Sequence, residues 1–321
     1  MTTDEWYLFL LSYFYPIFFI SCIFLQSVLF YTIFFHSPKN MSRMRYFIGN
    51  TCICQIILVS STCFGQFRAV SDKVPVEFRA YGPVRHFPAI VGFTFTEIVQ
   101  LGLMISHLSI VTTLYLKFEA VRSLDLKSKK ITFMICLIQS PSLVSLIAES
   151  TTVIVTQLPE ERQQYYAAVN KNTTQYSVIG SGLQTLSSSI NVSLYVVMSL
   201  LAPIVCFFLR RSILAHINMH LNRSSHMNNL HHRLFVKGLT IQVVLPLFCF
   251  VPILVIYFYC IVTHEVILFN QYFMYLAPAF SSFFDPLVAL WFVAPYRKKI
   301  KTWLHLDKTS IVAVAPESTG S

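Results

Sequence analysis

The chain has 321 residues, of which 55% are hydrophobic and only 12% charged, and it carries a net charge of +10. A water-soluble domain carries about 25% charged residues, so this composition excludes an ordinary soluble protein. The basic residues lie between alternate apolar blocks and belong to no nucleic-acid-binding motif. The positive charge therefore indicates cytoplasmic loops and argues against nucleic acid as a partner.

Seven apolar blocks are long enough to cross a bilayer, which takes about 20 residues per helix. The first follows a short N-terminus (residues 1–7) that contains no Lys or Arg, and it is far longer than the apolar core of a signal peptide. We therefore predict an uncleaved first span. The expected spans are 8–35, 46–66, 88–116, 131–155, 188–209, 238–262 and 267–294. The polar stretches 67–87 and 156–187 are expected to be loops.

The distribution of basic residues predicts the orientation of the bundle. Eighteen of the 24 Lys and Arg residues lie in the loops after the first, third and fifth spans and in the tail at 295–321. The other six lie in the loops on the opposite side. Because the side richer in Lys and Arg faces the cytoplasm, we predict an extracellular N-terminus and a cytoplasmic C-terminal tail.

Three acidic residues lie within the expected spans, where an isolated charge costs roughly 2.5–3.5 kcal/mol. Glu97, about two turns into the third span, is a candidate ligand-binding residue or else bonds to a neighbouring helix. Asp285 and Pro286 are candidates for a switch in the seventh helix or else have a structural role. Glu149 lies near the outer end of the fourth span and is expected to reach water as an interfacial charge.

Residues that could bind metal or catalyse a reaction form no convincing site. His216 and His220 have helical i, i+4 spacing, but no carboxylate or cysteine accompanies them in the same loop. The eight cysteines lie in or beside apolar blocks, as small buried hydrophobic residues do. The chain has no P-loop, nucleophile elbow or HExxH helix. We therefore expect no enzyme activity, no catalytic residue, no metal and no cofactor.

Two kinds of loop residue carry further predictions. Lys127 and Arg297 lie just inside the membrane, where they are expected to contact anionic lipid headgroups. Of four Asn-x-Ser/Thr tripeptides, only Asn172-Thr173-Thr174 lies in a predicted outer loop. Asn172 is therefore the single glycosylation candidate.

Four stretches of the chain form a familiar pattern. They are Ser37-Pro38 with Arg45-Tyr46, Tyr81-Gly82-Pro83-Val84-Arg85, Leu245-Pro246, and Asp285-Pro286 followed by Phe292-Val293-Ala294-Pro295-Tyr296-Arg297. With these stretches the chain resembles the nematode serpentine chemoreceptors, and class D (delta) in particular. It departs from rhodopsin-like receptors at Leu116-Lys117-Phe118-Glu119, where those have an acidic-arginine-aromatic triplet.

The resemblance implies an all-α, polytopic bundle of the G-protein-coupled-receptor type that detects small-molecule chemical cues. It places the ligand in the outer half of the bundle and a heterotrimeric G protein against the inner loops, including Arg211 and Arg233. It also implies the plasma membrane of chemosensory neurons.

Two alternatives remain. A ligand-gated channel of inverted seven-helix topology is opposed by the charge distribution. A small-solute transporter is opposed by the odd number of spans and the absence of a detectable repeat.

Overall fold

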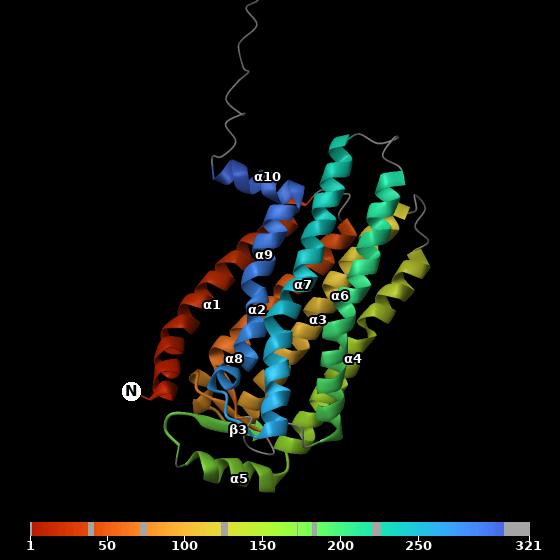
Figure 1. Cartoon of the computed structure of the whole chain (residues 1–321). Helices are drawn as coiled ribbons and strands as arrows, with labels where there is room; N and C mark the ends of the chain where they lie inside the picture. Colours follow the sequence, from red (N-terminus) through yellow and green to blue (C-terminus); the bar gives the residue numbers. More distant parts are fainter. Residues whose placement is uncertain are drawn as a thin grey trace, which may run out of the picture.

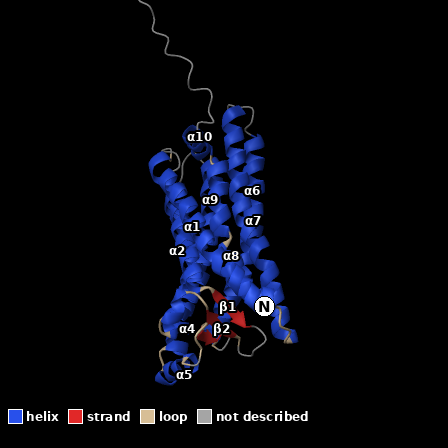
Figure 2. Ribbon diagram, turned by 90° about the vertical axis from the view of Figure 1, so that its left-hand side faces the viewer, coloured by secondary structure: helices blue, strands red, loops and turns tan. Residues whose placement is uncertain are grey.

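The computed structural model describes residues 2–37, 42–70, 76–122, 128–171, 173–181, 185–219 and 226–304. Within them, seven helical segments are long and apolar enough to cross a membrane, and they lie side by side as one bundle (Figures 1 and 2). The first six spans are α1 (Thr3–His36), α2 (Ser42–Gly65), α3 (Ala89–Arg122), α4 (Ser128–Gln157), α6 (Leu186–Met219) and α7 (His226–Thr263). The seventh consists of α8 (Leu268–Ala279) and α9 (Ser281–Phe292). The predicted seven-helix membrane fold is confirmed.

The helices are longer than the apolar blocks predict. At 34 residues, α1 is about 51 Å long, whereas the hydrocarbon core of a bilayer is about 30 Å thick. It begins at Thr3, because the Thr2 hydroxyl accepts a hydrogen bond from the Glu5 amide while the Glu5 carboxylate accepts one from the Thr2 amide. Polar residues at the helix ends therefore continue the spans beyond the membrane.

The second, third and seventh spans form the centre of the bundle. At least half of the apolar stretch of each is buried inside the protein, against about a fifth for α1, α4 and α6. Those three helices present phenylalanine and other large apolar side chains to the outside, as lipid contact requires. The N-terminus and α10 (Ala294–Trp303) lie at opposite ends of the bundle (Figure 1).

The seventh span is broken at Phe280, between α8 and α9. Pro286 lacks the N–H that would bond to the carbonyl of Ser282 one turn earlier. The side-chain amide of Gln26 in α1 donates to that carbonyl over 2.7 Å. A neighbouring helix thus satisfies the backbone group that the proline leaves unpaired, as the membrane interior requires.

The two segments expected to be loops contain regular structure at the end of the bundle where the N-terminus lies. Strands β1 (Phe67–Val70), β2 (Glu77–Ala80) and β3 (Ser177–Ser181) form an antiparallel sheet in the order β1-β2-β3. We call it the lid sheet. The short helix η2 (Pro83–His86) follows β2, and α5 (Glu160–Asn170) precedes β3. The lid sheet and α5 cover that end of the bundle (Figure 2).

Candidate functional site

A small cavity lies beneath the lid sheet, enclosed by four spans. It has a volume of about 60 Å³. Ala69 and Phe78 close it from the lid sheet, and the walls include Gln100, Val192, Tyr195, Leu254, Tyr257 and Tyr275. We call it the central cavity. It is smaller than the roughly 300–1,000 Å³ of pockets that hold drug-sized ligands, so a larger molecule requires movement of the walls or the lid.

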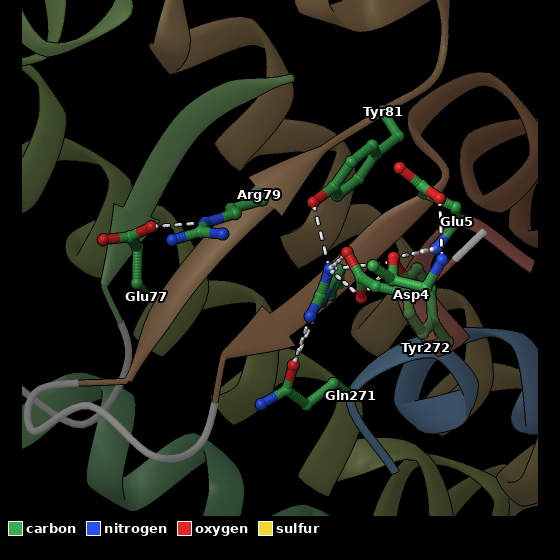
Figure 3. A network of polar contacts seen from close by, with 9 residues as sticks. Asp4, Glu5, Glu77, Arg79, Tyr81, Gln271 and Tyr272 are labelled. Carbon is green, nitrogen blue, oxygen red and sulfur yellow. Dashed lines mark hydrogen bonds and ion pairs between the residues drawn. The ribbon is translucent and has the colours of Figure 1, made fainter. Parts of the chain in front are cut away.

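One edge of the lid sheet is fixed by Arg68, which the sequence-based predictions did not single out. The Arg68 side chain is almost fully buried, and its Nε and Nη2 both donate to Gln271 Oε1, over 3.0 and 2.8 Å. Its Nη1 donates to the hydroxyl groups of Tyr272 and Tyr81 and lies 3.0 Å from a carboxylate oxygen of Asp4. Figure 3 shows these partners converging from α1, the segment just after β2, and α8.

A second arginine faces Arg68 across the sheet. Arg68 and Arg79 are directly paired between β1 and β2, an arrangement that destabilises a sheet when the charges are unbalanced. Each arginine has its own carboxylate: Arg68 forms an ion pair with Asp4, and Arg79 forms one with Glu77 (Figure 3). Partial burial lowers the pKa of Arg79, but the hydrogen bond and charge of Glu77 outweigh this effect and hold it above its ordinary value. Arg79 therefore remains charged beside Glu77.

The opposite edge of the lid sheet lies tightly on α3 and α4. A side chain on Gly180 of β3 would place its Cβ 2.3 Å from a ring atom of Phe93, so only glycine permits this approach. The Gln157 amide, at the end of α4, donates to the carbonyl of Ile179 over 3.1 Å. Both edges of the lid sheet are therefore attached to the bundle.

Glu97 and Glu149, the acidic residues of the third and fourth spans, are both buried. Glu97 is only 8% exposed and makes no hydrogen bond to a residue that the structure describes. It lies one turn from Gln100, a residue of the central cavity wall. The structure thus provides no hydrogen bond from Glu97 to a described residue of a neighbouring helix.

The expectation that Glu149 reaches water is wrong. The side chain is 3% exposed, and its Oε1 lies 3.0 Å from Ser145 Oγ and accepts a hydrogen bond from Asn191 Nδ2 over 3.1 Å. Asn191 also donates to Gln100, which joins α4 and α6 to the wall of the central cavity. The prediction fails because Glu149 faces the bundle interior, where Ser145 and Asn191 lie within hydrogen-bond distance of its carboxylate.

Asp285 lies in a second polar cluster, deeper in the bundle. It accepts a hydrogen bond from the Gln55 side chain, and Gln55 in turn accepts one from Gln26 over 2.7 Å. The backbone carbonyl of Asp285 accepts from Gln242 over 3.1 Å. Asp285 also borders a cavity of about 20 Å³, which is room for one water molecule. The cluster links the first, second, sixth and seventh spans next to Pro286.

The remaining predicted residues are not brought together into one site. Arg211 and Arg233 lie exposed on α6 and α7, and Arg297 is half-buried on α10. All three helices extend from the end of the bundle opposite the lid sheet (Figure 1). Lys127 and Asn172 lie outside the described residues.

Two of the stretches that carry the resemblance have clear structural roles. In the stretch that follows β2, Gly82 lies so near the end of α2 that a Cβ would be 2.3 Å from the Phe64 carbonyl oxygen, and Pro83 begins η2. In the stretch at the opposite end of the bundle, Pro295 lies in the first turn of α10 and the buried Tyr296 forms a 2.6 Å hydrogen bond with Ser37. That bond joins α10 to the end of α1.

Comparison with known proteins agrees with this architecture. The family described as "Serpentine type 7TM GPCR chemoreceptor Srd" matches residues 11–302. The chain is 40% identical to serpentine receptor class delta-40 of Caenorhabditis elegans, over 93% of this chain and 94% of that protein. It is 35% identical to class delta-46 of the same organism, over 92% of this chain and 93% of that protein. It is 36% identical to class delta-47, also of that organism, over 95% of this chain and 96% of that protein.

Proposed function

Because the chain belongs to the Srd family of serpentine seven-transmembrane chemoreceptors, we propose that it is a G-protein-coupled receptor for a small chemical cue bound in the central cavity. The observation that carries this proposal is the central cavity itself, which lies between four spans and directly beneath the lid sheet. A ligand there would contact the helices whose relative positions define a receptor's states.

The lining of the central cavity favours a small, mostly apolar ligand. Tyr195, Tyr257 and Tyr275 offer aromatic surfaces, while Gln100 offers an amide for one polar group. We propose that Glu97, one turn away, adjusts the electrostatic field of this site. A ligand shifts the receptor between states only by its difference in affinity for them.

The proposed transmission route runs through the inner polar cluster. Asp285 and Pro286 lie where the first, second, sixth and seventh spans share hydrogen bonds, so a shift of α9 would require these bonds to rearrange. We propose that Lys127, Arg211, Arg233 and Arg297, besides contacting lipid, attract the acidic surface of a heterotrimeric G protein. The lid sheet would then face the outside of a chemosensory neuron.

The test is a reporter assay in cells that express the receptor with a promiscuous G protein, screened with small volatile and water-soluble compounds. Val192→Phe on α6 narrows the central cavity and should reduce the potency of an active compound by about tenfold or more. Val197→Phe, on the same helix but exposed, is the matched control and should leave potency unchanged. Equal potency for both variants would show that the ligand does not bind in the central cavity.

Two further outcomes separate the rival functions. An agonist-evoked current that survives blockade of G proteins would indicate the channel, and accumulation of the compound in cells would indicate the transporter. Signalling that persists when Lys127, Arg211 and Arg233 are all replaced by glutamine would exclude these residues as the G-protein contact.

A further inference from the structure

A second and larger pocket lies outside the lid sheet, between η2, α5 and the adjoining ends of α3 and α4. Its volume is about 500 Å³, within the roughly 300–1,000 Å³ of known small-molecule sites. We call it the outer pocket. It shares no lining residue with the central cavity, and its lining includes Gln157 of α4 and Ser177 of β3.

The chemistry of the outer pocket differs from that of the central cavity. Arg85 is its single charged lining residue among those described, and side-chain amides come from Gln157, Gln163, Gln164 and Asn170. The two carboxylates of α5, at Glu160 and Glu161, are not part of the lining. The remaining wall is apolar or aromatic and includes Phe87, Ile90 and Tyr166.

Hydrogen bonds hold these walls in place. The Asn170 side chain binds both the N–H and the carbonyl of Val178, over 2.7 and 3.0 Å, which joins α5 to β3. Arg85 Nη1 donates to the carbonyl of Gln175 over 3.0 Å, and Arg85 Nε lies 3.3 Å from a His86 nitrogen. The other amino group of Arg85, Nη2, has no hydrogen-bond partner among the described residues.

We propose that the outer pocket is a binding site for a small amphiphilic carboxylate, distinct from the ligand site in the central cavity. The carboxylate binds the Arg85 guanidinium, which forms charge-assisted hydrogen bonds with such planar anions. The amides bind further polar groups, and the apolar body lies against Phe87 and Tyr166. Because Ser177 of β3 and Asn170 also border the pocket, an occupant contacts the elements that support the lid sheet.

The experiment uses the full-length receptor in lipid nanodiscs, with 2-naphthoate as the probe and 2-naphthamide as its uncharged counterpart. Binding is followed by naphthyl fluorescence, with empty nanodiscs subtracted for partition into lipid. We expect saturable binding of naphthoate, weaker binding of naphthamide, and a loss of about tenfold or more in naphthoate affinity on Arg85→Gln. Arg162→Gln, which removes an exposed cation of α5 outside the pocket, should have little effect.

A second pair of variants tests the location without altering charge. Ala167 lines the outer pocket and Ala168 does not, although both are exposed on α5. Ala167→Trp should fill the pocket and abolish naphthoate binding, whereas Ala168→Trp should not, with thermal unfolding showing that both variants are folded.

The proposal is overturned by absence of saturable naphthoate binding at millimolar concentration, by equal affinities for the acid and the amide, or by equal effects within either pair of variants. None of these outcomes bears on the central cavity, which the reporter assay tests separately.

Discussion

Arg68 is the residue on which three parts of the lid-sheet end of the bundle converge. Its guanidinium reaches Asp4 of α1, Tyr81 beyond β2, and Gln271 and Tyr272 of α8. The cation also lies 4.4 Å from the centre of the Tyr272 ring, which adds a cation–π contact. Replacing this one side chain removes hydrogen bonds between β1 and three segments that are distant from one another in the sequence.

We therefore predict that Arg68→Met lowers the free energy of unfolding by about 2 kcal/mol or more, since hydrogen bonds to a charged group are each worth about 1.5–3 kcal/mol. Thermal unfolding of the purified receptor measures the effect. Arg162→Met, which changes an exposed arginine of α5, should stay within about 0.5 kcal/mol of the unaltered protein. If the two variants melt together, Arg68 does not fasten the lid sheet.

Gln26 gives a second prediction at this scale, because its amide donates a hydrogen bond to the Ser282 carbonyl, which Pro286 leaves unpaired. Gln26→Leu should destabilise the receptor by about 1–2 kcal/mol. Pro286→Ala restores a backbone donor for that carbonyl, so the cost of Gln26→Leu should fall in the double variant. A cost that is unchanged by Pro286→Ala would contradict this role of Gln26.

At the scale of the elements, the spans were predictable and the lid sheet was not. Each span is set by a local run of apolar residues. The lid sheet depends on pairing β2 with β3, which lie about a hundred residues apart and are only four and five residues long. Strands this short, with Arg68 and Arg79 among them, have no periodicity that distinguishes them from polar loops.

The same limit applies to the site residues. Asp285 is predictable as a candidate because it is a charge in an apolar span, whereas its partners Gln26 and Gln55 are uncharged and less conspicuous in the sequence. A polar amide within an apolar span was the available signal, because it must find a partner there. Arg68 gave a weaker signal, since its burial depends on residues at the two ends of the chain.

Gly82 supplies the prediction for the elements at the lid-sheet end of the bundle. The atom that a side chain there would meet is the carbonyl oxygen of Phe64, which belongs to the backbone and cannot turn aside. We expect Gly82→Ala to separate η2 from α2 and to lower stability by about 1–3 kcal/mol. Gly49→Ala, within α2, leaves its nearest atom at 3.4 Å and should be neutral or stabilising, because alanine favours helix. Comparable losses of surface expression for both variants would refute this account.

At the scale of the whole molecule, the predicted orientation is open to a direct measurement. An epitope tag on the N-terminus should be stained on intact cells, and a tag on the C-terminus only after permeabilisation, because most Lys and Arg residues lie on the side of the tail. Asn172→Gln should remove the glycan from the receptor. Glycan at Asn40 or Asn222, or the reverse staining pattern, would invalidate the receptor topology and favour the inverted channel.

The connections of Arg68 also determine an order of assembly. Tyr272 and Asp4, which it joins, are 268 positions apart, so one partner is synthesised among the first residues and the other with the last span. Strand β3 arrives only after the fourth span has been inserted. A nascent chain that stops before α8 therefore lacks the Gln271 and Tyr272 partners that Arg68 has in the finished receptor. We therefore expect the lid-sheet end of the bundle to be completed by the final insertion event, and exposure of Arg68 to distinguish an unfinished receptor from a finished one during biogenesis.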